Sequence, residues 1–322
     1  MTRSRKHMVA AIDIGGTNVR GGLVDREGNI TGMTHRPSHA AEGRGALLET
    51  LKAVIDELRT AHPIAAVGIG SPGSINHRDG IIRYMQAHIP GWTGTPVGPL
   101  VTEWTGVPAA IDNDVNLIAL GENWIGAGKG SRCQLSIALG TGLGGGIVIN
   151  GRVMRGALGR AAEFGHVIVV PNGEPCTCGN YGCVEVYTAP GAMVRRVHHY
   201  LRIGVPSALA GRKDISAKDI IEEGAKGDHL CRRLLDDAAR CLALVVWNLM
   251  QIFDPDVFVI GGGLMKAGKV FLDPFHNELD RYYQPPELTP LITIRVSKLG
   301  DNAGILGAAR LAWQWLDGTD RD

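Results

Sequence analysis

Short apolar stretches rich in valine and isoleucine alternate with glycine turns near the start of the chain. Three of them are predicted as strands of an antiparallel meander: Met8–Ile14, Val19–Val24 and a third from Ile30. Leucine and isoleucine then recur at helical spacing over Ala46–Leu58, and a buried strand is indicated at Ala65–Gly70. A meander followed by helix and strand units is typical of an α/β lobe.

The same order of strand, glycine turn and strand returns later in the chain. A strand at Gln134–Leu139 leads into glycine-rich residues 140–146, then a strand at Ile147–Ile149 and the type I′ hairpin signal Asn150-Gly151. The remaining elements are predicted at these places: strands Ala109–Ile111, Val257–Ile260 and Leu291–Val296, and helices Val115–Ile125, Val184–Tyr200, Ala217–Glu223, His229–Phe253, Met265–Tyr282 and from Ala303. Two parts of the chain therefore begin alike.

The length supports two lobes, because 322 residues exceed what a single hydrophobic core usually serves. No proline- or serine-rich linker separates the two glycine-rich parts, so we expect a helix or hinge near Val115–Lys129 at the boundary. The predicted lobes are residues 1–116, joined by the C-terminal helix at about 303–322, and residues 117–302.

Charge and hydropathy exclude several classes of protein. Thirty-three basic and 32 acidic residues give a net charge of +1, which leaves no excess to track a nucleic-acid backbone. The uncharged run Cys241–Phe253 is too short to span a bilayer, and Asp13 interrupts the first apolar stretch before it reaches signal-peptide length. We therefore expect a cytoplasmic protein without nucleic-acid or membrane partners.

Glycine-rich turns are candidate phosphate sites, because glycine lets backbone amides approach a ligand closely. Asp13-Ile14-Gly15-Gly16-Thr17-Asn18 forms the first, although an ordinary glycine turn would read alike. The second, residues 139–146, contains the spacing GxGxxG, but a strand follows it where the dinucleotide fingerprint requires a helix. A Walker A loop is excluded as well, since Gly130 follows Gly128-Lys129.

The segment Asp112-Asn113-Asp114 opens a predicted helix, where capping alone would also select acids and amides. If the glycine-rich turns hold the phosphates of a nucleotide, phosphoryl transfer needs one carboxylate to accept the proton of the attacking hydroxyl, and a helix N-terminus holds such a group ionised and in place. Asp114 is our candidate for this base.

The most specific local pattern is a set of metal-ligating residues. His166 is followed after nine residues by Cys176, then by Cys178 and, after four more residues, by Cys183. One imidazole and three thiolates close a tetrahedral Zn²⁺ site with no open position, so this zinc is predicted to be structural. The second ring nitrogen of His166 would then be available to bond a hydroxyl.

Together these segments resemble two known groups of proteins. Both glycine hairpins and the third run Gly261-Gly262-Gly263 are similar to the phosphate-1, phosphate-2 and adenosine elements of the sugar kinase, actin and Hsp70 superfamily. The whole chain resembles the ROK (repressor, open reading frame, kinase) family, glucokinase branch. The resemblance rests on these segments: Asp13–Asn18, Asp112–Glu122, Leu139–Gly146, Glu163–His166, Cys176–Glu185 and Gly261–Gly263.

The resemblance implies a two-lobed α/β fold of the actin-like, ribonuclease H-like ATPase type with a structural zinc loop. It implies ATP, Mg²⁺, transfer of phosphate to the 6-hydroxyl of a hexose in carbohydrate metabolism, and a homodimer or homotetramer. The sugar contacts carried over are Gly73, Asn113, Asp114, Glu163, His166 and Glu185. The nucleotide and Mg²⁺ contacts are Asp13, Gly15, Gly16, Thr17, Asn18, Gly140, Thr141, Gly142, Gly144, Gly261, Gly262 and Gly263.

Two departures from the family pattern bear on specificity and local structure. Ala162 stands where the family usually has glycine before Glu163, and His88 stands where glucokinase relatives commonly have asparagine. D-glucose is the expected substrate, with N-acetylglucosamine, N-acetylmannosamine and fructose as the alternatives. A sugar-sensing regulator without turnover is the alternative outside enzymes, and we expect no DNA-binding head before the first hairpin.

Overall fold

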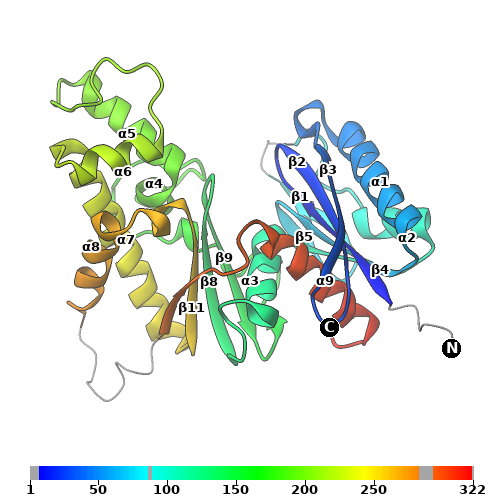
Figure 1. Ribbon diagram of the computed structural model, residues 1–322. Coiled ribbons are helices and arrows are strands. Elements are labelled where there is room, and N and C mark those ends of the chain that lie inside the picture. The colour runs from blue at the N-terminus through cyan, green and yellow to red at the C-terminus, as the bar shows by residue number, and fades with distance from the viewer. Residues whose placement is uncertain (1–6, 86–88, 283–292, 321–322) are drawn as a thin grey trace. The chain divides into compact units, whose positions relative to one another are not determined.

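The computed structural model describes residues 7–85, 89–282 and 293–320 (Figure 1). The chain divides into two compact units. Unit 1 comprises residues 1–134, 146–162 and 298–322, and unit 2 comprises residues 135–145 and 163–297.

Unit 1 is built on a five-stranded sheet in the order β3-β2-β1-β4-β7. Its strands are β1 (Met8–Ile14), β2 (Asn18–Val24), β3 (Ile30–Pro37), β4 (Ile64–Ser71) and β7 (Ala109–Asn113). Strands β1, β2 and β3 are antiparallel neighbours, which confirms the predicted meander, and β4 and β7 join in parallel. The parallel pairs place Asp13, Gly70 and Asp112 side by side at one edge of the sheet.

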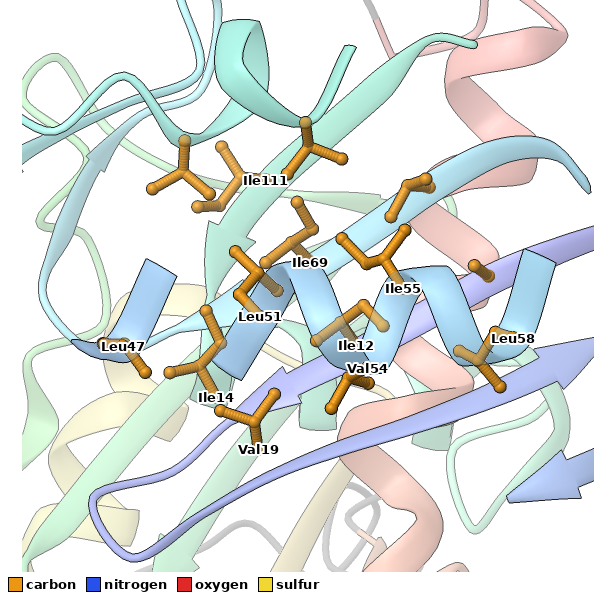
Figure 2. Close-up of a cluster of buried hydrophobic side chains, with 14 of the residues drawn as sticks. Ile12, Ile14, Val19, Leu47, Leu51, Val54, Ile55, Leu58, Ile69 and Ile111 are labelled. Atoms are coloured by element: carbon orange, nitrogen blue, oxygen red, sulfur yellow. The ribbon is translucent and has the colours of Figure 1, made fainter. Parts of the chain in front are cut away.

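Both faces of this sheet are buried around its central strand β1, as the nearly continuous apolar sequence of β1 requires, whereas the edge strand β3 is mostly exposed. Helices α1 (Arg44–Ala61) and α2 (Val97–Thr105) belong to one core, whereas α3 (Asp114–Ile125) and α9 (Ala303–Leu316) belong to the other. Figure 2 shows the first core, in which Leu51 and Ile55 of α1 lie over Ile12 and Ile69 of the sheet. The alternation of side chains along β1 sends Ile12 to this core and Ala11 to the other.

Unit 1 also contains a small hairpin of β5 (Ser74–Asn76) and β6 (Ile81–Tyr84). The sheet that enters unit 2 has the order β10-β9-β8-β11-β12. Its strands are β8 (Cys133–Leu139), β9 (Leu143–Ile149), β10 (Arg152–Val153), β11 (Val257–Gly262) and β12 (Thr293–Val296). Asn150 and Gly151 join β9 to β10 with φ of 52° and 75°, as the predicted type I′ turn requires.

The helices of unit 2 surround α7 (His229–Phe253), whose predicted bounds are confirmed. Their bounds are α4 (Glu185–Thr188), α5 (Pro190–Arg202), α6 (Ala217–Ala225) and α8 (Lys269–Leu279). Helices α4, α5, α6 and α8 all contact α7, which is buried along most of its length. Short 3₁₀ turns occupy the following segments: Ala40–Glu42, Phe164–His166, Gly263–Lys266 and Gly300–Asn302.

Three predicted elements differ in the structure. The helix expected over Val184–Tyr200 is interrupted, because α4 ends at Thr188 and Pro190 starts α5. The helix expected over Met265–Tyr282 is interrupted at Gly268, whose φ is 69°. Strand β9 begins at Leu143 and therefore includes Gly144, Gly145 and Gly146 of the predicted turn. Of the strand predicted at Leu291–Val296, residues 293–296 are described and form β12.

Unit 1 contains α3, α9 and residues 146–162 in addition to the first sheet. The sequence predicts lobes of residues 1–116 with 303–322 and of residues 117–302. These boundaries differ from the two units at α3 and at the β9–β10 segment. Functional lobe boundaries stay a prediction. Among the residues that the structure describes, no helix combines the length and the apolar character needed to cross a bilayer.

Candidate functional site

The first glycine hairpin connects β1 to β2 and carries Asp13 at its base. The Gly15 amide donates to the Asn18 carbonyl oxygen at 2.9 Å, and the Ser38 hydroxyl donates to the Gly16 carbonyl oxygen at 2.7 Å. Residues 16–18 are exposed at the tip. The hairpin is therefore held at its base, while its tip remains accessible to a ligand.

Asp13 lies near the C-terminal end of β1, where Gly304 of α9 packs closely against its side chain. A Cβ atom on Gly304 of α9 would lie 2.9 Å from its carboxyl carbon, so glycine is needed there. Burial raises the pKa of Asp13, and the positive charge of Arg20 opposes this rise. A cation near this carboxylate would stabilise its ionised form.

Asn113 and Gly73, two predicted sugar contacts, are bonded to each other. The Asn113 side chain caps α3 by accepting hydrogen bonds from the amides of Val115 at 2.9 Å and Asn116 at 3.2 Å. Its amide nitrogen donates to the Gly73 carbonyl oxygen at 3.2 Å. Gly73 has a φ of 102°, and a Cβ atom there would lie 2.7 Å from the Tyr84 carbonyl oxygen. The helix cap therefore fixes the glycine turn after β4.

Asp114 is the first residue of α3 and is half-buried. Its carboxylate accepts a hydrogen bond from the Val115 amide at 3.0 Å. Burial, followed by the negative charge of Asp13, raises the pKa of Asp114 to about 6. A carboxylate with this pKa is ionised at neutral pH and can still accept a proton in the transition state, which is what a general base needs.

Asp112 belongs to a buried cluster of charged side chains that no sequence pattern indicated. We call this cluster the Asp320 network, and its members are Asp112, Arg155, Asp320 and His77. Arg155 bonds both aspartates, and His77 contacts Asp320. Burial is the largest influence on the pKa of His77 and lowers it, but the hydrogen bond to Asp320, the negative charge of Asp112 and the hydrogen bond to the Ile111 carbonyl together raise the pKa above its ordinary value. The members come from four distant parts of the chain, so no local motif signals the cluster.

In unit 2 the second glycine hairpin and the third glycine run lie side by side. The Gly140 amide donates to the Gly142 carbonyl oxygen at 2.9 Å across the hairpin, where Gly140 and Thr141 are exposed. A Cβ atom on Gly262 would lie 2.1 Å from the Leu139 carbonyl oxygen, so the third run needs glycine to pass the end of β8. Gly144 lies inside β9.

Glu185 links the second hairpin to the cysteine loop. It is the first residue of α4, and its carboxylate accepts a hydrogen bond from the Leu143 amide at 3.0 Å. A Cβ atom on Gly142 would lie 2.4 Å from the same carboxylate oxygen. The predicted sugar-binding acid therefore also bonds the backbone at the end of the predicted phosphate hairpin.

Glu163 precedes the 3₁₀ turn Phe164–His166 and is exposed. Ala162, which replaces the glycine usual in the family, has a φ of 65°. This left-handed conformation is the one that glycine adopts without strain. The backbone thus keeps a glycine-like conformation at this departure, whereas the other departure, His88, lies outside the described residues.

We expect Ala162→Gly to stabilise the protein. Relief of the left-handed strain is worth about 1–2 kcal/mol, and the greater freedom of glycine in the unfolded chain offsets part of this gain. A net increase of ~0.5–1 kcal/mol in the free energy of unfolding would appear in urea denaturation. Ala161→Gly, next in the chain and outside the positive-φ residues, is the control and should destabilise.

The predicted metal ligands lie together in unit 2. Ligand atoms of His166, Cys176, Cys178 and Cys183 all fall within 4.8 Å of one another. Cys176 Sγ is 3.7 Å from His166 Nδ1, and Cys178 Sγ is 3.7 Å from Cys183 Sγ. A tetrahedral zinc with Zn–S bonds of about 2.3 Å has ligands ~3.8 Å apart, so the donor set fits this ion. With Nδ1 facing the thiols, Nε2 is the His166 nitrogen suited to meet a hydroxyl.

Comparison with known proteins identifies the family. The model of the ROK family matches residues 9–314. The chain is 33% identical over 321 residues to a glucokinase of Thermotoga maritima, covering 97% of this chain and 99% of the relative. It is 34% identical to a glucokinase of Streptomyces coelicolor, covering 95% and 97%.

A solved structure gives the same result for the fold. The ROK family glucokinase of Streptomyces griseus in complex with glucose and AMPPNP is 33% identical, with a TM-score of 0.78, over 95% of this chain and 99% of that one. The predicted relationship and fold class are therefore confirmed. The chain belongs to the ROK family and has the α/β, actin-like fold of its sugar kinases.

Proposed function

We propose that this protein is an ATP-dependent glucokinase that phosphorylates the 6-hydroxyl of D-glucose. The observation that carries the proposal is Asp114, a half-buried carboxylate at the start of α3 with a pKa raised to about 6. It adjoins Asn113, which is bonded to Gly73. Glucokinase relatives with similarity over nearly the whole chain, one of them solved with glucose and AMPPNP, support the substrate and the nucleotide.

In the proposed reaction, Asp114 accepts the proton of the 6-hydroxyl as the oxygen attacks the γ-phosphorus in line. The bond between the γ-phosphorus and the bridging oxygen breaks, and ADP leaves with the electron pair. Because the base is fixed by a helix cap and its own backbone contact, little reorganisation is needed at the moment of transfer. Asn113, Gly73, Glu163, His166 and Glu185 are assigned to the other hexose contacts.

The nucleotide is assigned to the glycine segments. Exposed amides and Thr17 of the first hairpin, and Gly140–Gly142 of the second, would bind phosphate oxygens. Gly261–Gly263 would pass beside adenosine. Mg²⁺, when bound near Asp13, would neutralise phosphate charge, and zinc held by His166 and the three cysteines would fix the loop. Assembly as a homodimer or homotetramer in the cytoplasm is part of the same proposal.

The substrate is tested by a coupled assay of ADP release with Mg-ATP. The panel is glucose, N-acetylglucosamine, N-acetylmannosamine and fructose, with a reaction lacking sugar to measure hydrolysis. The highest kcat/KM for glucose supports the proposal. A higher value for a 2-acetamido sugar or for fructose would reassign the substrate, and the absence of sugar-dependent turnover in folded protein would favour a non-catalytic sensor.

The pH dependence of kcat/KM tests the base separately. Asp114 must be ionised to accept a proton, and its pKa is raised to about 6, so activity should fall as pH decreases through that value. We expect half of the maximal kcat/KM near pH 6 and a loss of about tenfold per unit below it. An acid limb that stays flat down to pH 4.5, measured in folded protein, would contradict this assignment.

A further inference from the structure

The Asp320 network begins at the buried carboxylate of Asp112, two residues before the proposed base in the chain. Asp112 is the neighbour of Asn113, and its side chain is 2% exposed. One carboxylate oxygen accepts hydrogen bonds from the Asn113 amide at 2.7 Å and the Asn116 side chain at 3.0 Å. The other accepts from Arg155 Nε at 2.7 Å. Asp112 therefore holds the end of β7 and the first turn of α3 to a residue far away in the sequence.

Arg155 continues the network to the C-terminal segment beyond α9. Its two terminal nitrogens donate to the two carboxylate oxygens of Asp320, at 3.0 Å and 2.6 Å. This fork bonds one carboxylate in a bidentate manner while the Nε atom bonds the other, a geometry that lysine cannot reproduce. The side chain of Arg155 is 13% exposed and that of Asp320 is 3% exposed, so solvent screens these bonds weakly.

His77 closes the network into a ring. Its Nε2 lies 3.2 Å from an Asp320 carboxylate oxygen, and its Nδ1 lies 2.9 Å from the Ile111 carbonyl oxygen. Ile111 immediately precedes Asp112. The C-terminal segment is thus attached to the end of β7 at two points, through Arg155 and through His77.

Stability alone does not account well for such an arrangement. Removing two carboxylates and a guanidinium from water is costly, and well-packed apolar side chains often serve the stability of a core equally well. What the network provides is a defined geometry at the β7–α3 junction, where Asn113 and Asp114 stand. Small displacements of reacting groups cost large factors in rate, so a device that fixes this junction has a direct use in catalysis.

We propose that Arg155, Asp320 and His77 are positioning residues for phosphoryl transfer. They hold Asp112, and through it they set the position of the Asp114 carboxylate relative to the hexose hydroxyl. The inference rests on the proposed role of Asp114 as the base. It assigns a catalytic consequence to a C-terminal segment that follows α9 and is remote in sequence from every residue of the candidate site.

The test compares Asp320→Asn and Arg155→Lys with a matched control. Asp317→Asn breaks another bidentate aspartate–arginine pair of the same segment, to Arg26 at 2.8 Å and 2.9 Å, which is exposed. Both network variants should lower kcat by about 10- to 100-fold with less than a twofold change in KM for ATP, and the control should stay within twofold of wild type. Unchanged kcat in both network variants, with only a lower melting temperature, would overturn the proposal.

A double variant separates this inference from the assignment of the base. If Asp320 acts through Asp114, then Asp320→Asn should not slow the Asp114→Asn protein any further, since the two changes remove the same contribution. Multiplicative losses in the double variant would overturn the inference. Full turnover in Asp114→Asn would instead overturn the base, whatever Asp320→Asn does. Arg155→Lys keeps the charge and carries the same comparison if Asp320→Asn fails to fold.

Discussion

Asp114→Asn is expected to reduce kcat by a factor on the order of 10²–10⁴ while the fold remains intact. Asparagine can keep the hydrogen bond from the Val115 amide, because its side-chain oxygen accepts as the carboxylate does. It cannot accept the proton of the sugar hydroxyl. The measurement is sugar-dependent ADP release under saturating substrates, with circular dichroism to establish that the variant is folded.

The same substitution should stabilise the protein at neutral pH. The folded-state pKa of Asp114, about 6, lies above the ordinary value of 3.8, so ionisation is more costly in the folded state. The protonated Asp114 carboxyl therefore contributes to the free energy of unfolding below pH ~4, and this contribution is lost as pH rises through about 6. Asparagine carries no charge, and the variant should gain ~1–3 kcal/mol in the free energy of unfolding at pH 7.

The control for both readouts is Asp56→Asn, which neutralises an exposed aspartate of α1 paired with Lys52. It should leave kcat unchanged and alter stability by less than about 1 kcal/mol. Turnover of Asp114→Asn within tenfold of wild type would rule out the base. Loss of activity together with lower stability would show that the substitution had disturbed the α3 terminus instead.

Loss of the zinc cluster is the second large effect that we expect. Cys178→Ser removes one of four ligands at a partly exposed position, so it creates no buried cavity. The zinc content should fall well below one ion per chain, and the melting temperature should drop, because structural zinc binding contributes directly to folding. The KM for glucose should rise by about 10- to 100-fold, since the same loop carries His166 and Glu185.

Cys133→Ser is the matched control, because Cys133 is also partly exposed and lies outside the cluster. It should retain metal, melting temperature and KM. The two variants and the wild-type protein are compared by metal analysis with mass spectrometry, by thermal unfolding and by sugar kinetics, all on the same preparations. Wild-type protein with almost no metal and full activity would contradict the structural role of zinc.

The parts of the fold that followed from sequence are those with strong local signals. The alternation around Met8–Val24 and the long apolar periodicity of α7 gave elements that match the structure closely. The interruptions at Pro190 and Gly268 were missed because the apolar period continues across them. The glycine content of residues 144–146 predicts a turn, but these residues belong to strand β9, and Gly146 packs closely against Ala119.

Site residues divide in the same way. The members of the cysteine cluster, and likewise Asp112–Asp114, are close in sequence, so the grouping of the four ligands and the capped start of α3 could be predicted from spacing. Arg155 and Asp320 stand 165 residues apart, and neither has a local pattern that distinguishes it from a surface charge. Their partnership depends on where the C-terminal segment lies after α9, and only tertiary structure supplies that information.

Unit 1 cannot complete its fold on the ribosome until helix α9, near the C-terminal end of the chain, has been synthesised. Helix α9 covers one face of the first sheet, and Gly304 packs against Asp13 near the opposite end of the chain. Until the ribosome has made residues 303–316, β1 and β4 lack this cover. At about 5–20 residues per second, a nascent chain therefore carries an open apolar sheet for tens of seconds. We therefore expect chaperones that bind exposed apolar surface to act on the first sheet during translation.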